Sequence, residues 1–319
     1  MASDVDAVPL DVVTVRSGSG ATTRIRDALL VVDKNELVFA LGKFAVVHNL
    51  PKQELTVLSG QQPTPLAVPA PSHKARPTSH KHQHTDHAAD ELGAITAMAL
   101  DGKRIHVSIC RAAVTSGMGA TVSIHSLKSG SSASPSTPYR QRGARLKTLS
   151  FGGAECFSGV TMSTDGKLVC CQSANASWTL VVWDWSRERQ IAVSDVHCKV
   201  TRVRFNAIDM AQISTSGGYQ LKLWTLCEYT LKSIASFKSG DETRVRHKIA
   251  SYADHVWLPD DCLVALLDDG SVQLIINGEL LQTVQALTSA SRAYCIITQN
   301  NGEPGVMVGG SDDMDMGLN

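Results

Sequence analysis

The sequence predicts an all-β protein made of short antiparallel strands, and three observations lead to this prediction. Short apolar runs recur along the chain, either alternating with polar residues or apolar throughout. Each run is bounded by Gly, Asp, Asn or Ser, which favour tight turns. A unit of four such runs is written out twice between Phe157 and Phe237, with Trp183 and Trp224 lying 41 residues apart. Four strands in roughly 40–45 residues is the period of one β-propeller blade.

Taken in order, the chain opens with a polar lead at residues 1–22, and we expect the propeller to occupy residues 23–310. The first unit has Asp33-Lys34-Asn35 and Gly42-Lys43 as its turns. Its predicted strands are at residues 28–32, 36–41, 44–50 and 55–58.

The composition changes sharply at residues 61–92, where prolines are dense and His80, His82, His84 and His87 follow among polar residues. Such a segment buries too little apolar surface to offset its ordering entropy, so we expect a disordered insertion between strands. Alternating histidines are also candidate ligands for a transition metal. No Cys or carboxylate completes a recognisable ligand set here, so a solvated loop is the favoured interpretation.

Five units and the start of a sixth can be recognised. The second unit is extended by a Ser-, Pro- and Gly-rich loop at residues 129–143, and an acidic tail is expected at 311–319. A propeller closes by pairing strands from its two ends within one blade. We therefore expect an incomplete propeller, with the missing blade supplied from elsewhere or by a longer protein. The remaining predicted strands are at residues 95–100, 105–109, 121–127, 145–149, 157–162, 168–171, 178–185, 190–193, 200–205, 211–214, 219–224, 231–237, 255–258, 262–267, 271–276, 280–284, 294–298 and 305–308.

Short motifs assign these units to the WD40 type of propeller. Trp183-Asp184 is a WD dipeptide at the end of a strand, and His197 lies where WD repeats carry the His of a Gly-His pair. In WD repeats this His, a strand Ser or Thr, a turn Asp and the strand-end Trp form a structural hydrogen-bond network. Ser214 or Ser216 and Trp224 are candidates for two of its members, and Asp269 occupies the turn of the fifth unit. Since no unit carries the full set, the repeats are degenerate.

The tryptophans are first of all packing residues. Burial of Trp183 and Trp224 between blades accounts for their presence, because a Trp side chain covers a large apolar area. Trp178, which begins its strand beside a turn, is less constrained and is a candidate partner contact as well as a packing residue. Arg202, Arg204 and Lys222 alternate with apolar residues and are interpreted as the solvated face of a strand.

Composition limits the classes of partner. Lys plus Arg and Asp plus Glu are both 30, which gives a net charge of zero and weakens nucleic acid or an anionic membrane as the main partner. The N-terminus lacks a charged-then-apolar signal, and no long apolar stretch spans a bilayer, so an intracellular protein is expected. The eight cysteines have no C-x-x-C spacing and are interpreted as buried thiols, with a redox or zinc role as the alternative.

A search for chemistry finds no recognisable motif. Gly117-Met118-Gly119 lacks the rest of a phosphate-binding loop, and there is no Gly-x-Ser-x-Gly or His-Glu-x-x-His. The pairs Asp260-Asp261, Asp268-Asp269 and Asp312-Asp313 are interpreted as turn or tail carboxylates rather than general acids. We expect no enzyme, no cofactor and no metal.

The order and spacing of four segments resemble the N-terminal propeller of the cilia- and flagella-associated protein 57 family. The resemblance is best over residues 157–280. It implies a non-enzymatic scaffold of the ciliary or flagellar axoneme, in a family that helps to anchor and regulate inner-arm dyneins on doublet microtubules alongside other ciliary WD-repeat proteins. The segments are Trp178–Trp185, Val200–Asn206, Gly217–Trp224 and His255–Asp261.

Two functional hypotheses follow from these observations. The first is this axonemal scaffold, in which a propeller holds other proteins through its loops and faces. The second is a soluble cytoplasmic WD40 adaptor in a complex outside the cilium. A coiled coil encoded downstream would favour the first, and a genome that lacks flagella would remove it.

Overall fold

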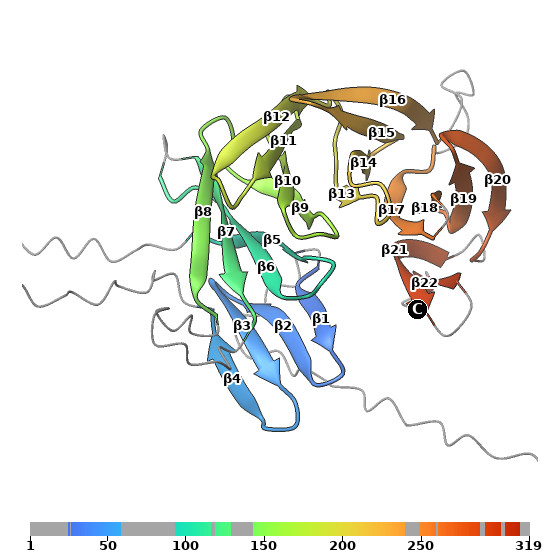
Figure 1. Cartoon of the computed structure of the whole chain (residues 1–319). Helices are drawn as coiled ribbons and strands as arrows, with labels where there is room; N and C mark the ends of the chain where they lie inside the picture. The colour runs from blue at the N-terminus through green and yellow to red at the C-terminus, as the bar shows by residue number, and fades with distance from the viewer. Residues whose placement is uncertain are drawn as a thin grey trace, which may run out of the picture.

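The chain forms an open β-propeller. The computed structural model describes residues 25, 27–58, 93–115, 119–128, 143–239, 249–259, 261–287, 291–300 and 304–312. These residues form five four-stranded antiparallel sheets and one two-stranded sheet, arranged as successive blades around a common centre (Figure 1). The all-β propeller prediction is thereby confirmed.

Each blade is a simple meander in which consecutive strands pair. In each four-stranded blade the first strand lies nearest the centre of the molecule and the last at its periphery (Figure 1). Blade one contains β1 (Leu29–Asp33), β2 (Glu36–Leu41), β3 (Phe44–Asn49) and β4 (Glu54–Val57). Blade two contains β5 (Ile95–Leu100), β6 (His106–Arg111), β7 (Ala120–Ser126) and β8 (Arg145–Phe151). Blade three contains β9 (Phe157–Met162), β10 (Leu168–Ser173), β11 (Thr179–Asp184) and β12 (Arg189–Asp195).

The second half of the chain repeats this plan until the sixth sheet. Blade four contains β13 (Arg202–Phe205), β14 (Gln212–Gly217), β15 (Gln220–Cys227) and β16 (Thr230–Lys238). Blade five contains β17 (Tyr252–Leu258), β18 (Cys262–Leu267), β19 (Ser271–Ile276) and β20 (Glu279–Gln285). Blade six contains only β21 (Ser291–Asn300) and β22 (Pro304–Asp312) within the described residues.

The core is divided among the contacts between neighbouring blades. Because alternate side chains of a strand point to opposite faces, each inner blade contributes to two apolar clusters. In β10, for example, Cys171 packs towards blade two and Cys170 packs towards blade four. Among the described residues there are five such clusters, one for each contact between consecutive blades. Six blades in a closed ring would have a sixth contact, so this arrangement is a row with two ends.

The cysteine prediction is only partly right. Cys110, Cys170, Cys171 and Cys262 are buried, and burial raises the pKa of the Cys170 thiol. Cys227 and Cys295 are exposed, which corrects the interpretation of all eight as buried thiols. Cys295 is exposed because, among the described residues, no further blade packs on that face of β21.

Several predictions lie outside the described residues. They concern the polar lead, the insertion at 61–92 with its four histidines, most of the loop at 129–143 and the tail beyond Asp312. Within the described part of the chain, no helix has the length and apolar character that crossing a bilayer requires.

Candidate functional site

A buried carboxylate, Asp254, joins three blades near the centre of the propeller. A bulge between Tyr252 and Asp254 shifts the register of β17 against β18, and the Asp254 side chain is 1 % exposed. Its Oδ1 lies 2.9 Å from Arg202 Nε, and its Oδ2 accepts a 3.1 Å hydrogen bond from Arg202 Nη2. Arg204 Nη2 donates to Oδ1 at 3.4 Å, and the backbone N–H of Ile296 in β21 donates to Oδ2 at 3.3 Å. One carboxylate therefore links blades four, five and six.

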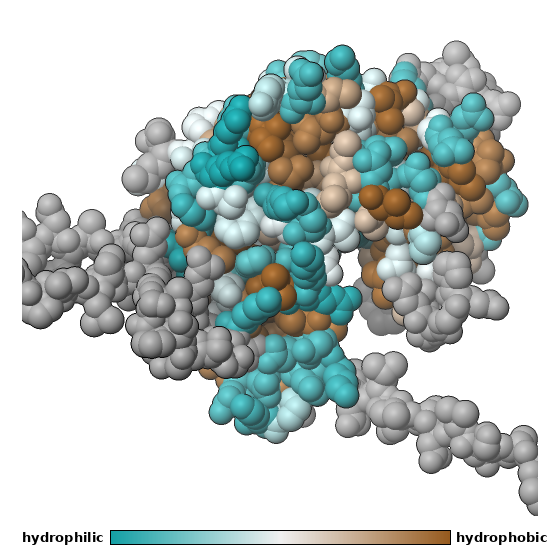
Figure 2. All heavy atoms as spheres, in the orientation of Figure 1, coloured by the Kyte–Doolittle hydropathy of each residue, from teal (hydrophilic) through white to brown (hydrophobic). Residues whose placement is uncertain are grey.

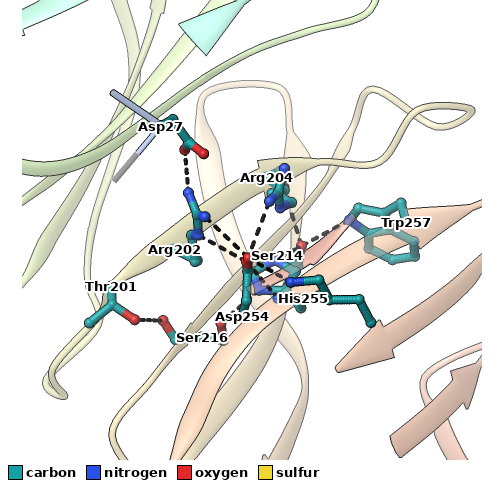
Figure 3. Close-up of polar contacts among 10 residues, drawn as sticks. Asp27, Thr201, Arg202, Arg204, Ser214, Ser216, Asp254, His255 and Trp257 are labelled. Carbon is teal, nitrogen blue, oxygen red and sulfur yellow. Dashed lines mark hydrogen bonds and ion pairs between the residues drawn. The ribbon is translucent and has the colours of Figure 1, made fainter. Parts of the chain in front are cut away.

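The two arginines come from alternate positions of β13, so both point towards blade five (Figure 3). Their side chains are 11 % and 32 % exposed, which corrects the interpretation of Arg202 and Arg204 as a solvated face. Arg202 also pairs with Asp27, which precedes β1. Lys222 is likewise held inside, because its Nζ donates to the Val196 carbonyl at 2.8 Å.

The cluster contains two carboxylates and two guanidinium groups, so its charges sum to zero. The guanidinium groups determine the protonation state of Asp254. Burial alone would raise the pKa of Asp254, but the nearby Arg204 and Arg202 guanidinium groups hold it below its usual value. Asp254 is therefore ionised at neutral pH and attracts both arginines. A buried ion pair with this many hydrogen bonds specifies how blades pack, and loss of one member leaves uncompensated charge.

The neighbouring residue, His255, forms a second network on the opposite face of β17. Its Nε2 lies 2.8 Å from Ser214 Oγ and its Nδ1 lies 2.7 Å from Ser216 Oγ (Figure 3). Trp257 Nε1 donates to Ser214 Oγ at 2.8 Å, and Ser214 Oγ donates to the Arg204 carbonyl at 3.3 Å. These contacts are all satisfied when Nε2 carries the proton and Ser216 donates to Nδ1.

Full burial keeps this histidine neutral. Desolvation, with a smaller contribution from Arg204, lowers the pKa of His255 to about 3. A neutral imidazole with one donor and one acceptor matches the two serine hydroxyls. The network holds blade four on blade five, and it leaves neither ring nitrogen available to a substrate.

The residues that were predicted to form one structural hydrogen-bond network do not all lie together. Ser214 belongs to the His255 network, whereas His197 has an exposed side chain and donates its backbone N–H to the Ser177 carbonyl at 3.1 Å. The histidine in this hydrogen-bond network is therefore His255 instead of His197. Trp224 donates from Nε1 to Thr215 Oγ1 at 2.9 Å within its own blade.

The remaining proposed positions have packing or turn roles. Trp183 is buried, with its ring centroid 6.2 Å from that of Phe157. Asp184 accepts a 2.7 Å hydrogen bond from Ser186 Oγ after β11, and Asp269 accepts a 2.9 Å hydrogen bond from the Ser271 N–H before β19. Trp178 is half-buried against the cluster between blades three and four, and a partner contact through it stays a prediction.

Sequence reasoning missed Asp254, His255 and the pairing role of the arginines. The predicted strand began at His255, which left Asp254 outside it. One signal was available: Ser214 and Ser216 occupy alternate positions of one strand, and His255 and Trp257 occupy alternate positions of the strand that packs on it. Polar residues on a buried face require partners, and here each set satisfies the other.

The centre of the propeller also contains a small cavity. It has a volume of about 170 Å³ and is lined by the inner strands of blades one to four, including Ser158, Thr161, Arg202 and Arg204. Among the described residues there is no group of three or more His, Cys, Asp or Glu side chains that could hold a metal ion.

Comparison with known proteins identifies the same fold. One chain in the crystal structure of a mitotic checkpoint complex aligns with a TM-score of 0.57 at 14% identity, covering 97% of this chain and 80% of that one. The WD40 β-propeller domain of Doa1 aligns with a TM-score of 0.53 at 14% identity, covering 88% of this chain and 73% of the other. At this identity the likeness shows the fold, and the fold is that of WD40 propellers.

Sequence comparison gives a narrower but weak similarity. The chain is 25% identical over 126 residues to cilia- and flagella-associated protein 57 of Mus musculus. The match covers 39% of this chain and 9% of the mouse protein, so it spans a small part of that relative. No protein-family profile matches the chain.

Proposed function

We propose that this protein is a non-enzymatic WD-repeat scaffold of the ciliary or flagellar axoneme. The observation that carries the proposal is the similarity to cilia- and flagella-associated protein 57, found in a chain that has the WD40 propeller fold. In this proposal the propeller binds other axonemal proteins, in the manner of relatives that anchor or regulate inner dynein arms on doublet microtubules.

The hydrogen bonding of the buried polar groups supports a scaffold function. Asp254 is surrounded by donors from blades four, five and six, and His255 is neutral with both ring nitrogens bonded. Groups held in this way fix the relative positions of blades. Interactions with partners then fall to the exposed strands and loops at the periphery, such as β20, where Leu280, Leu281 and Val284 are exposed (Figure 2).

Cell fractionation tests the proposal. A tagged copy is expressed from its own locus, cells are extracted with non-ionic detergent, and the residual cytoskeleton is washed with high salt. We expect retention in the axoneme through the detergent step. Release by salt would indicate a charged peripheral contact, because salt screens interactions between exposed charges.

The opposite outcome has a defined meaning. Complete loss into the detergent-soluble fraction would contradict an axonemal scaffold and would favour the soluble cytoplasmic adaptor. A tagged axonemal protein of known retention, followed in the same cells, controls for loss of axonemes during extraction.

A further inference from the structure

Blade one has one covered face and one open apolar face. The covered face packs on blade two through Val32, Val38 and Val47. On the opposite face, six large apolar side chains are exposed to between 40% and 61%. A contiguous apolar patch of this kind usually marks a binding surface. The six residues are Leu29, Val31, Leu41, Phe44, Leu55 and Val57.

Blade six, at the other end of the row, also has one covered face and one open apolar face. Its covered face packs on blade five through Ile296, Val306 and Val308, while Ile297 is 50% exposed and Met307 is 49% exposed on the other face. Within the described residues, β22 is hydrogen-bonded to β21 on one side, whereas the second strand of every other blade is paired on both sides. Figure 2 shows open space between blade one and blade six.

The surface that these two ends expose is large enough for a stable contact. With Tyr294, nine side chains are about half exposed. Together they present roughly 300–500 Å² of apolar surface. One partner of a standard interface buries about 800 Å². The half-buried Leu37 and Phe39, on the same face of blade one, add to this area and bring it close to the lower end for specific interfaces, about 600 Å² per partner.

The shape of the opening favours a sheet from another polypeptide over a second copy of this chain. A twisted sheet face is covered best by another sheet, as the five contacts between blades show. The occupant must be apolar on both faces, since it lies between two open faces. In a second copy of this chain, every inner blade already has both faces covered. Only the two end blades of that copy have an open face, and each has one, so an end blade could cover one of the two open faces but not both.

We propose that a separate protein donates one or two β-strands to this opening. These strands lie between the two open faces as a further blade, and they cover Ile297 and Met307 on one side and the open face of blade one on the other. The donated segment has apolar side chains on both of its faces. This inference rests on the scaffold function and is independent of the axonemal location.

Exposed cysteines provide a direct test with a maleimide as the probe. Cys295 lies in β21 beside the opening, and Cys227 is an exposed cysteine at the end of β15 in blade four. The full chain is labelled both as purified protein and in native extract of its own cells. We expect Cys295 to react about tenfold more slowly in the extract, as occupancy of nine molecules in ten would produce. Cys227 should react equally in both.

Substitutions link this protection to the opening. The double variant Met307→Lys and Val57→Lys places charge on both open faces and should restore the labelling of Cys295 in extract. Ile208→Lys is the matched control, because Ile208 is 60% exposed in the turn between β13 and β14, and it should leave the protection unchanged. A photo-crosslinking residue in place of Met307 should form an adduct with a peptide of a second protein.

Three outcomes would overturn the inference. Equal labelling of Cys295 in both samples would show that nothing covers the opening. Protection in purified protein that depends on concentration would assign the opening to a second copy, and protection that persists on dilution would assign it to the chain's own residues. Protection in a detergent-soluble fraction would preserve this inference while contradicting the axonemal location.

Discussion

Asp254 shows how a single side chain can organise several blades. It receives donors from two arginines of β13, from the backbone of β21 and from its own neighbour. Arg202 extends the cluster to Asp27 ahead of blade one. The cluster therefore ties the two ends of the open row to its middle.

Replacement of Asp254 by Asn tests this role. The change keeps the size of the side chain but removes its charge, so two arginines lose their common partner. We expect the free energy of unfolding to fall by about 3–5 kcal/mol, the usual effect of breaking a buried ion pair. Urea unfolding measures it. Asp209→Asn, at an exposed turn residue, should change stability by less than about 0.5 kcal/mol, and equal effects of the two variants would contradict the argument.

His255 predicts how stability depends on pH. In the unfolded chain His255 takes up a proton near pH 6.5. In the folded chain its imidazole stays unprotonated until the pH approaches the His255 pKa of about 3. The contribution of His255 to stability is therefore complete above pH 6.5 and falls by about 1.4 kcal/mol per pH unit below it. Burial also lowers the pKa of His125, to about 4, so that His125 adds a parallel loss over the same range. Asp254, whose pKa is lowered, adds a further loss only when the pH falls below the unfolded value for Asp.

Unfolding measured between pH 7 and pH 4 checks this dependence. His255→Gln should be less stable at pH 7 but should show a flatter pH profile, while His197→Gln, at an exposed histidine, should keep the wild-type slope. Parallel profiles for the wild type and His255→Gln would show that His255 does not set the slope.

At the scale of strands and turns, close backbone approaches fix the blades. A Cβ at Gly217 would lie 2.6 Å from the Lys199 carbonyl oxygen and 2.7 Å from the Thr201 nitrogen, where β14 meets the segment that leads into β13. Gly217→Ala should therefore cost about 1–3 kcal/mol in unfolding free energy, because these backbone atoms have to move. Gly152→Ala, with open space around its Cβ, is the control in the same denaturation assay. Similar stabilities would contradict this account.

Strands were far easier to predict than the polar clusters that join them. Each strand run is short and lies between turn residues, so local sequence was sufficient to place all of them to within a few residues. Arg202 and Arg204 alternate with apolar residues as surface residues do, and their partner is 50 residues or more away. Local pattern cannot reveal such pairing, and the bulge in β17 that brings Asp254 inside leaves no separate mark in the sequence.

At the scale of the whole molecule, stability should depend on position in the row of blades. Inner blades have a neighbour on both faces, whereas blades one and six have a neighbour on one. In repeat architectures stability is approximately a sum of unit and neighbour contributions. The two ends therefore contribute the least, and blade six, which has two strands in the part of the chain that the structure describes, contributes less than blade one.

Hydrogen–deuterium exchange followed by mass spectrometry measures this gradient. We expect β9–β12 and β13–β16 to be the most protected, and β21 and β22 to open with protection lower by at least about tenfold. Asp254→Asn removes the charge beside the Ile296 N–H and should speed exchange in β21 more than in β9–β12. Uniform protection across all blades would contradict the gradient, because it would require the ends of the row to be covered as well as its middle.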